Sequence, residues 1–113
     1  MASTINLYID QGSDFHTSLI LQNDDGSIID LSGYSIYSQF RKSFNSSQYY
    51  SFSCSIIGPP ANGEISLELS GRISSDIHSG RYLYDIEIVD SVDDIQVRVV
   101  EGLVTLSPEI TKI

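Results

Sequence analysis

The sequence contains little of the chemistry that enzymes and metal proteins use. Among 113 residues there is one cysteine, Cys54, and there are two histidines, His16 and His78. One cysteine excludes a disulfide within the chain and a cysteine-based metal site. A zinc site needs three or four ligands at consistent spacing, and the two histidines belong to no such set. We therefore interpret Cys54 as a small residue of the core or its border, and both histidines as structural or surface residues.

Basic residues are also scarce. Six Lys and Arg stand against 15 Asp and Glu, which gives a net charge of −9, and the six are spread along the chain. Nucleic acids and anionic membranes attract concentrated Lys and Arg, so we expect neither as a partner. No apolar run approaches the roughly 20 residues of a membrane span. The first residues also lack the basic and then apolar pattern of a signal peptide.

Catalytic motifs are absent too. No glycine-rich loop follows a strand and opens a helix, and no serine has the Gly-x-Ser-x-Gly setting of a hydrolase nucleophile. Catalysis needs titratable groups with perturbed pKa values in a pocket, and the sequence offers few candidates. We expect a protein that is not an enzyme and that binds no cofactor.

Two acidic clusters allow two interpretations. Asp24 and Asp25 form one, and Asp90, Asp93 and Asp94 form the other, both between expected strands. Converging carboxylates can bind calcium, whereas Asp in a tight turn accepts backbone hydrogen bonds and keeps the turn soluble. Neither cluster has the spacing of an EF-hand loop, and we favour turns.

What the sequence does have is alternation of apolar and polar residues, which is typical of strands. The segments with this pattern are 4–10, 14–22, 34–42, 49–57, 64–70, 80–90 and 95–107, with a short strand at 27–30. The last two long segments predict a central hairpin in which Tyr82, Tyr84, Ile86 and Ile88 face the core.

Strands that recur every 8–12 residues indicate an all-β fold. We predict one domain, residues 1–113, that is an immunoglobulin-like antiparallel β-sandwich of about seven strands. One short helical turn is expected near residues 72–78, where the period of two is lost. A closed barrel is the alternative.

Tyrosines are the most informative surface residues. Tyr37 and Arg41 alternate with the inward positions of segment 34–42, and Tyr49 follows the next loop. Because Tyr and Arg are enriched at protein interfaces, Tyr37, Arg41 and Tyr49 are our interface candidates. The alternative is that they are ordinary half-buried strand residues.

A resemblance to a known family rests on a set of short motifs in a fixed order. They are Tyr-Ile-Asp-Gln-Gly-Ser-Asp-Phe at 8–15, Asp-Leu-Ser-Gly-Tyr at 30–34, Gln-Phe-Arg-Lys at 39–42, Asn-Gly-Glu-Ile at 62–65, Ser-Gly-Arg-Tyr-Leu-Tyr-Asp at 79–85, Arg-Val-Val-Glu-Gly at 98–102 and Ser-Pro-Glu at 107–109. In this order, the chain resembles small tailed-bacteriophage virion proteins. It is also similar, along nearly its whole length, to the immunoglobulin-like N-terminal domain of phage baseplate upper proteins.

The resemblance implies a non-enzymatic structural module that is made in the host cytoplasm and docks onto a tail, a baseplate or another part of the virion. It implies other virion proteins as partners, several copies in a symmetric assembly, and no catalytic residues. In baseplate upper proteins the domain precedes segments that carry receptor binders. This sequence ends at Ile113, so we expect a stand-alone tail or baseplate adaptor or accessory component.

Three other functions are kept as alternatives. One is a decoration protein of the capsid or neck. Another is a module that binds host-surface carbohydrate, with Tyr37, Tyr49 and Tyr50 as stacking surfaces. The third is a sandwich stabilised by calcium.

Overall fold

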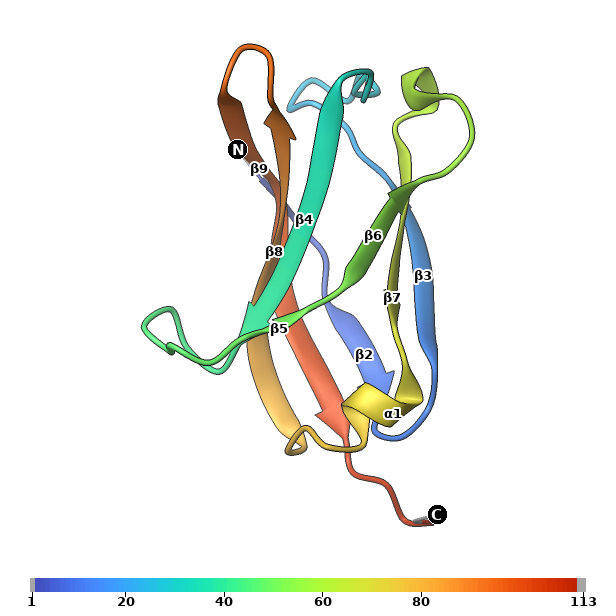
Figure 1. The fold of residues 1–113 in the computed structure, drawn as a ribbon, viewed down its shortest axis with the longest axis vertical. Coiled ribbons are helices and arrows are strands. Elements are labelled where there is room, and N and C mark those ends of the chain that lie inside the picture. The colour runs from blue at the N-terminus through green and yellow to red at the C-terminus, as the bar shows by residue number, and fades with distance from the viewer. Residues whose placement is uncertain (1, 112–113) are drawn as a thin grey trace.

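A computed structural model describes residues 2–111 and shows two β-sheets packed face to face (Figure 1). The larger sheet has the order β1–β9–β8–β4–β5, with β2 also paired to β9, and the smaller has the order β3–β7–β6. The predicted all-β sandwich is confirmed. The strands are β1 (Ser3–Thr4), β2 (Leu7–Asp10), β3 (Phe15–Ile20), β4 (Tyr34–Arg41), β5 (Tyr50–Ser51), β6 (Ser53–Ile56), β7 (Glu64–Leu69), β8 (Gly80–Asp90) and β9 (Ile95–Ser107).

The β8–β9 hairpin lies at the centre of the larger sheet, as predicted. Strand β8 pairs with β9 on one side and with the whole of β4 on the other. Alternation then fixes the faces of β8, so that its core-facing side chains are all buried. These are Tyr82, Tyr84, Ile86 and Ile88.

Strand β9 contains a bulge. Ile86 lies opposite Val100 but Glu87 lies opposite Arg98, so Val99 is the extra residue, and the side chains of Val99 and Val100 are both buried. Gly102, although a glycine, is not the bulge residue. It has another role, because a Cβ atom there would collide with the carbonyl oxygen of Ile5.

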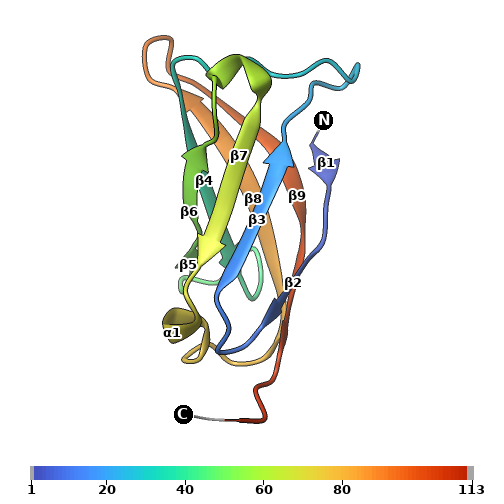
Figure 2. The ribbon, with the colours of Figure 1, turned by 90° about the vertical axis from the view of Figure 1, so that its right-hand side faces the viewer.

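The N-terminal strands differ from the predicted antiparallel arrangement. Both β1 and β2 run parallel to β9, which makes the larger sheet mixed. The turn at 11–14 then carries the chain across to β3 in the smaller sheet (Figure 2). Because the first strands stay with β9, β3 pairs with β7 alone among the strands described.

Two predicted strands are each divided in two, which explains why there are nine strands in place of about seven. Segment 4–10 breaks at Ile5 and Asn6, between β1 and β2. Segment 49–57 breaks at Phe52, where β5 leaves β4 and β6 joins β7, so the chain changes sheets. The Phe52 amide donates to the carbonyl of Ser38 at 3.0 Å, which holds this corner to the larger sheet. The predicted strand at 27–30 forms only an isolated bridge, from Gln22 to Ile28.

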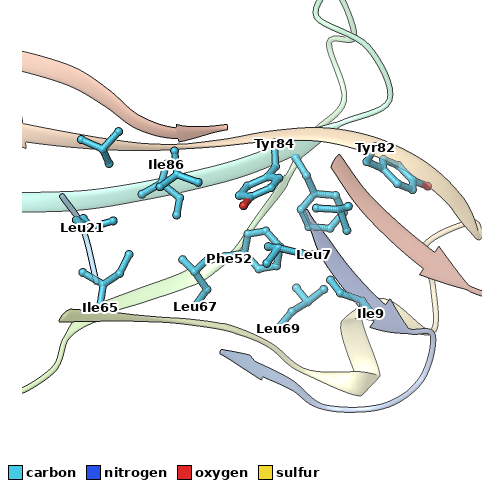
Figure 3. Close-up of a cluster of buried hydrophobic side chains, with 14 of the residues drawn as sticks. Leu7, Ile9, Leu21, Phe52, Ile65, Leu67, Leu69, Tyr82, Tyr84 and Ile86 are labelled. Carbon is cyan, nitrogen blue, oxygen red and sulfur yellow. The ribbon is translucent and has the colours of Figure 1, made fainter. Parts of the chain in front are cut away.

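The core fills the space between the sheets (Figure 3). Aliphatic residues from β7 and β2 meet aromatic residues from β8 and from the corner at Phe52. Phe40 and Phe52 have ring centroids 5.0 Å apart, and the Tyr82 ring meets Phe40 edge-on at 5.5 Å. Such tilted and edge-on pairs are the favoured aromatic geometries.

A short helix, α1 (Gly71–Ser74), lies at the predicted helical turn but begins earlier and ends earlier than residues 72–78. Its N-cap is Ser70, whose hydroxyl accepts a hydrogen bond from the Ile73 amide at 3.3 Å. One 3₁₀ turn, η1 (Pro60–Asn62), precedes β7. Among the described residues, no helix is long and apolar enough to cross a membrane.

Candidate functional site

A broad groove lies on the outer face of the larger sheet. It has a volume of about 960 Å³ and is lined by β1, β4, β8 and β9 together with the loop that follows β4. Its floor follows from strand alternation, because every second residue of β4 and β8 faces the core and the residues between them face outward. The side chains on which the site depends are Tyr37, Arg41, Phe44, Asp85, Glu87, Gln96, Arg98 and Glu101.

Aromatic side chains are exposed along one part of the groove. Tyr37 is 58% exposed, and Phe44, in the loop after β4, is 80% exposed. Figure 1 shows this loop projecting away from the sandwich. An exposed tyrosine and an exposed phenylalanine that line the same groove offer apolar area that a partner can cover.

Arg41 fastens the projecting loop to β4. Its guanidinium donates to the carbonyl of Ser46 at 2.8 Å and to the side-chain oxygen of Gln39 at 3.0 Å. The guanidinium carbon also lies 4.9 Å from the centre of the Tyr49 ring, which is a cation–π distance. Arg41 therefore lines the groove and also positions its wall.

The rest of the groove floor is a set of charges that compensate one another. Arg98 donates to Asp85 at 3.1 Å and to Glu101 at 3.5 Å, and the Gln96 amide donates to Glu87 at 2.5 Å. Burial and the nearby Glu87 raise the pKa of Asp85, and Arg98 opposes that shift. The floor is thus polar and partly desolvated.

The predicted interface residues fall in two places. Tyr37 and Arg41 both line the groove. Tyr49 is 48% exposed but stacks on Arg41 outside the lining, so it supports the wall. All three stay predicted interface residues, with Tyr37 the one most open to a partner.

Tyr50, expected as a stacking surface for carbohydrate, is not available. Its ring lies 5.3 Å from Phe40 and meets Tyr82 edge-on at 6.2 Å, against the core. The reason is alternation: Tyr50 shares the inward face with Phe52, so its neighbour Tyr49 faces outward.

The other titratable groups considered from the sequence lie apart from the groove. His16 is a surface residue of β3 with its Nε2 3.7 Å from Glu68. The Cys54 thiol is half-buried at the border of the core, where burial raises its pKa to about 11. Asp25 accepts hydrogen bonds from the amide and hydroxyl of Ser27, which lower its pKa. Within residues 2–111, no three His, Cys, Asp or Glu side chains gather where they could hold a metal ion.

Sequence reasoning missed the contribution of the hairpin and of Phe44. It assigned β8 and β9 to the core and sought the working surface on β4 and the loop that follows it, and the groove lining includes residues of both. Leu83, Asp85 and Glu87 alternate with the core tyrosines, so the same pattern that buried the tyrosines places them on the outer face. The signal for Phe44 was one aromatic residue within the Ser/Asn-rich segment 43–48.

The fold and the groove define an all-β sandwich module whose candidate binding surface is the outer face of its larger sheet. No protein-family model and no curated protein match the sequence. Solved structures of similar shape include InlP of Listeria monocytogenes, with a TM-score of 0.49 and 9% identity over 94% of this chain. Another is a family 123 glycoside hydrolase of Clostridium perfringens, with a TM-score of 0.44 and 13% identity over 98% of this chain. The chain spans 28% and 24% of the lengths of these two proteins, and likeness at this level carries no argument about function.

Proposed function

We propose that this protein is a non-enzymatic structural component of a bacteriophage virion, a tail or baseplate adaptor or accessory component that acts through protein–protein contacts. The resemblance of the ordered motifs to those of phage baseplate upper proteins supports the virion part of the proposal. The observation that carries the contact role is the exposed Tyr37 and Phe44 on a groove of about 960 Å³.

The composition of the groove suits a protein partner. Exposed aromatic and apolar area supplies the hydrophobic part of an interface, and Asp85, Gln96 and Arg98 supply polar groups around it. Because Arg98 already lies between Asp85 and Glu101, a partner does not have to neutralise a large charge of one sign. Binding then depends on covering Tyr37 and Phe44, which makes these two residues the expected hot spots.

The proposed location of the protein in the virion is tested on purified phage particles. Mass spectrometry should find the protein in intact virions, and immunogold labelling should place it on the tail or baseplate. Labelling of the capsid or neck would replace the adaptor role with a decoration role. Absence of the protein from particles would overturn the proposal.

The contact surface is tested with matched variants. The purified protein is added to phage particles that lack this protein, and its affinity for them is measured. Tyr37→Ala and Phe44→Ala should each lower that affinity roughly tenfold if each side chain is a hot spot. Tyr8→Ala is the control, because Tyr8 is 71% exposed on β2 and does not line the groove. Equal binding by all three variants would exclude the groove as the docking surface.

Carbohydrate binding is a second candidate function, favoured by one observation. The exposed ring of Tyr37 lines the same groove as Asp85, Gln96 and Arg98, and aromatic faces beside planar polar groups suit the faces and hydroxyls of a sugar. A glycan array decides between the two functions. Binding that Tyr37→Ala abolishes and Tyr8→Ala retains would support the carbohydrate role, and no binding at millimolar glycan would remove it.

A further inference from the structure

The free edge of β3 is an unpaired row of backbone hydrogen-bonding groups on the smaller sheet. Strand β3 pairs with β7 on one side only, and no described strand pairs with its other side. Figure 2 shows β3 at the margin of the smaller sheet, with β1 and β2 held in the other sheet by β9. This edge lies outside the groove on the larger sheet.

The register shows which groups are unpaired. The amide of Leu21 donates to the carbonyl of Gly63 at 2.8 Å, on the β7 side. Because backbone groups two residues apart point the same way, Thr17 and Leu19 also face β7. The amide and carbonyl groups of His16, Ser18 and Ile20 therefore point away from β7, toward the free edge.

This edge lacks the features that keep strand edges from pairing. Such features are proline, charged side chains, bulges and short length. Strand β3 reads Phe-His-Thr-Ser-Leu-Ile over six residues, without proline, Lys, Arg, Asp or Glu, and it pairs with β7 without a register shift. The other edges are less suitable. Strand β5 has two residues, β6 has four, and the β1–β2 edge is interrupted at Ile5 and Asn6. The part of β4 that β5 leaves uncovered is only residues 34–37, and the part of β9 before its pairing with β1 contains Arg98 and the bulge at Val99.

We propose that the β3 edge pairs with β3 of a second copy of this chain, antiparallel about a two-fold axis at Ser18. In this register Ser18 lies opposite Ser18 of the second copy and His16 lies opposite its Ile20. All three outward amides and carbonyls are then paired on each chain. The two smaller sheets become one continuous sheet, β6–β7–β3–β3–β7–β6.

Charge permits contact with a second copy at this edge, and packing favours it. A net charge of −9 repels another copy over most of the surface, but β3 carries no acidic residue, and Glu64 and Glu68 lie one strand back, on β7. Paired serines at the axis can form a cross-strand hydrogen bond. Phe15, Thr17 and Leu19 are half-buried on the inward face of the edge strand. In the dimer, the inward side chains of the second β3 would pack beside them and bury more of their surface.

Sedimentation velocity of the purified chain tests the proposal by mass. A species of twice 12.5 kDa should appear as the concentration rises. Ser18→Pro removes one edge amide from each chain, two hydrogen bonds per dimer, and should weaken the dimer roughly tenfold or more. Proline is tolerated at an edge position whose amide faces away from the sheet.

Ile20→Lys is the second variant, because a lysine side chain on an edge strand opposes pairing without removing an amide. Its control is Ile73→Lys: Ile73 is 52% exposed on α1 and Ile20 is 55% exposed on β3, so the two changes are matched. The control should dimerise like the unmodified chain. Dimerisation lost equally in both lysine variants would show a general charge effect and overturn the edge assignment.

Amide hydrogen exchange locates the contact. His16, Ser18 and Ile20 should exchange rapidly in dilute protein and become protected as the dimer forms, while Thr17 and Leu19 stay protected throughout. A chain that remains at 12.5 kDa with rapid exchange at those three amides would overturn the proposal. So would a dimer that leaves the three amides unprotected.

Discussion

The contact between Gly102 and the N-terminal segment yields the sharpest stability prediction. Gly102 lies in β9 beside Ile5 and Asn6, the two residues that link β1 to β2. A Cβ atom at Gly102 would collide with the carbonyl of Ile5. That carbonyl belongs to the backbone and cannot rotate away as a flexible side chain would. Gly102→Ala should therefore push residues 5 and 6 off β9.

The cost follows from the hydrogen bonds at this contact. The Ile5 amide donates to Glu101 at 3.0 Å, the Tyr84 hydroxyl donates to the Ile5 carbonyl at 2.6 Å, and the Leu103 amide donates to the Asn6 side chain at 3.1 Å. At about 0.5–1.5 kcal/mol each, their loss removes about 1.5–4.5 kcal/mol. The lower freedom of alanine in the unfolded chain offsets about 0.4–1 kcal/mol. We expect a net loss of roughly 0.5–4 kcal/mol in the free energy of unfolding.

Urea denaturation measures this loss, with Tyr84→Phe as the graded comparison. Tyr84→Phe removes one of the three hydrogen bonds and keeps the ring, so it should cost about 0.5–1.5 kcal/mol. Hydrogen exchange should show faster exchange at the β1 and β2 amides in Gly102→Ala. A loss below about 0.5 kcal/mol, less than that of one hydrogen bond, would refute the close contact between Gly102 and the Ile5–Asn6 segment.

Three further predictions concern the core, pH and calcium. Ile86→Ala should cost about 2–5 kcal/mol in urea denaturation, because Ile86 is fully buried. Burial raises the pKa of Cys54 from 9.0 to about 11 and that of Tyr84 from 10.0 to about 12. The folded protein then binds more protons than the unfolded chain above pH 9, so Tm should fall from about pH 9 through pH 12, less steeply in a Cys54→Ser, Tyr84→Phe double variant. Calcium should leave Tm unchanged, because Asp25 and Asp90 accept hydrogen bonds within their own turns; a rise in Tm would support the calcium alternative.

Much of the fold could be predicted because alternation is a local signal. The faces of β4 and β8 follow from the sequence, and Tyr82 and Tyr84 are buried as their spacing requires. Pairing partners are not local. Nothing in the residues of 4–10 indicates that they run parallel to β9, and nothing in 49–57 indicates that the strand changes sheets at Phe52.

The candidate site was harder to predict for the same reason. Tyr37 and Arg41 were found because they alternate with core residues on one strand. The groove also needs Asp85 and Arg98, which are 13 residues apart in sequence and meet only because β8 and β9 pair. The bulge at Val99 keeps Arg98 and Glu101 both on the outer face, and its position depends on the register of the whole hairpin.

The two proposed surfaces share one structural cause, which gives a way to separate them. The pairing of β1 and β2 with β9 places Thr4 and Asn6 in the lining of the groove and leaves β3 without a second neighbour. Gly102→Ala, studied well below its Tm, should therefore weaken binding to particles and leave dimerisation intact.

The Ser18→Pro variant should have the opposite effect, because its change lies on the edge and leaves the groove lining untouched. If both variants lost particle binding and dimerisation in parallel, the groove and the β3 edge would act as one surface. The dimer would then be part of the docking site, because a two-fold pair offers two grooves to a symmetric partner and gains from binding both at once. If Gly102→Ala lost only particle binding and Ser18→Pro lost only dimerisation, the groove and the β3 edge would be two independent contact surfaces.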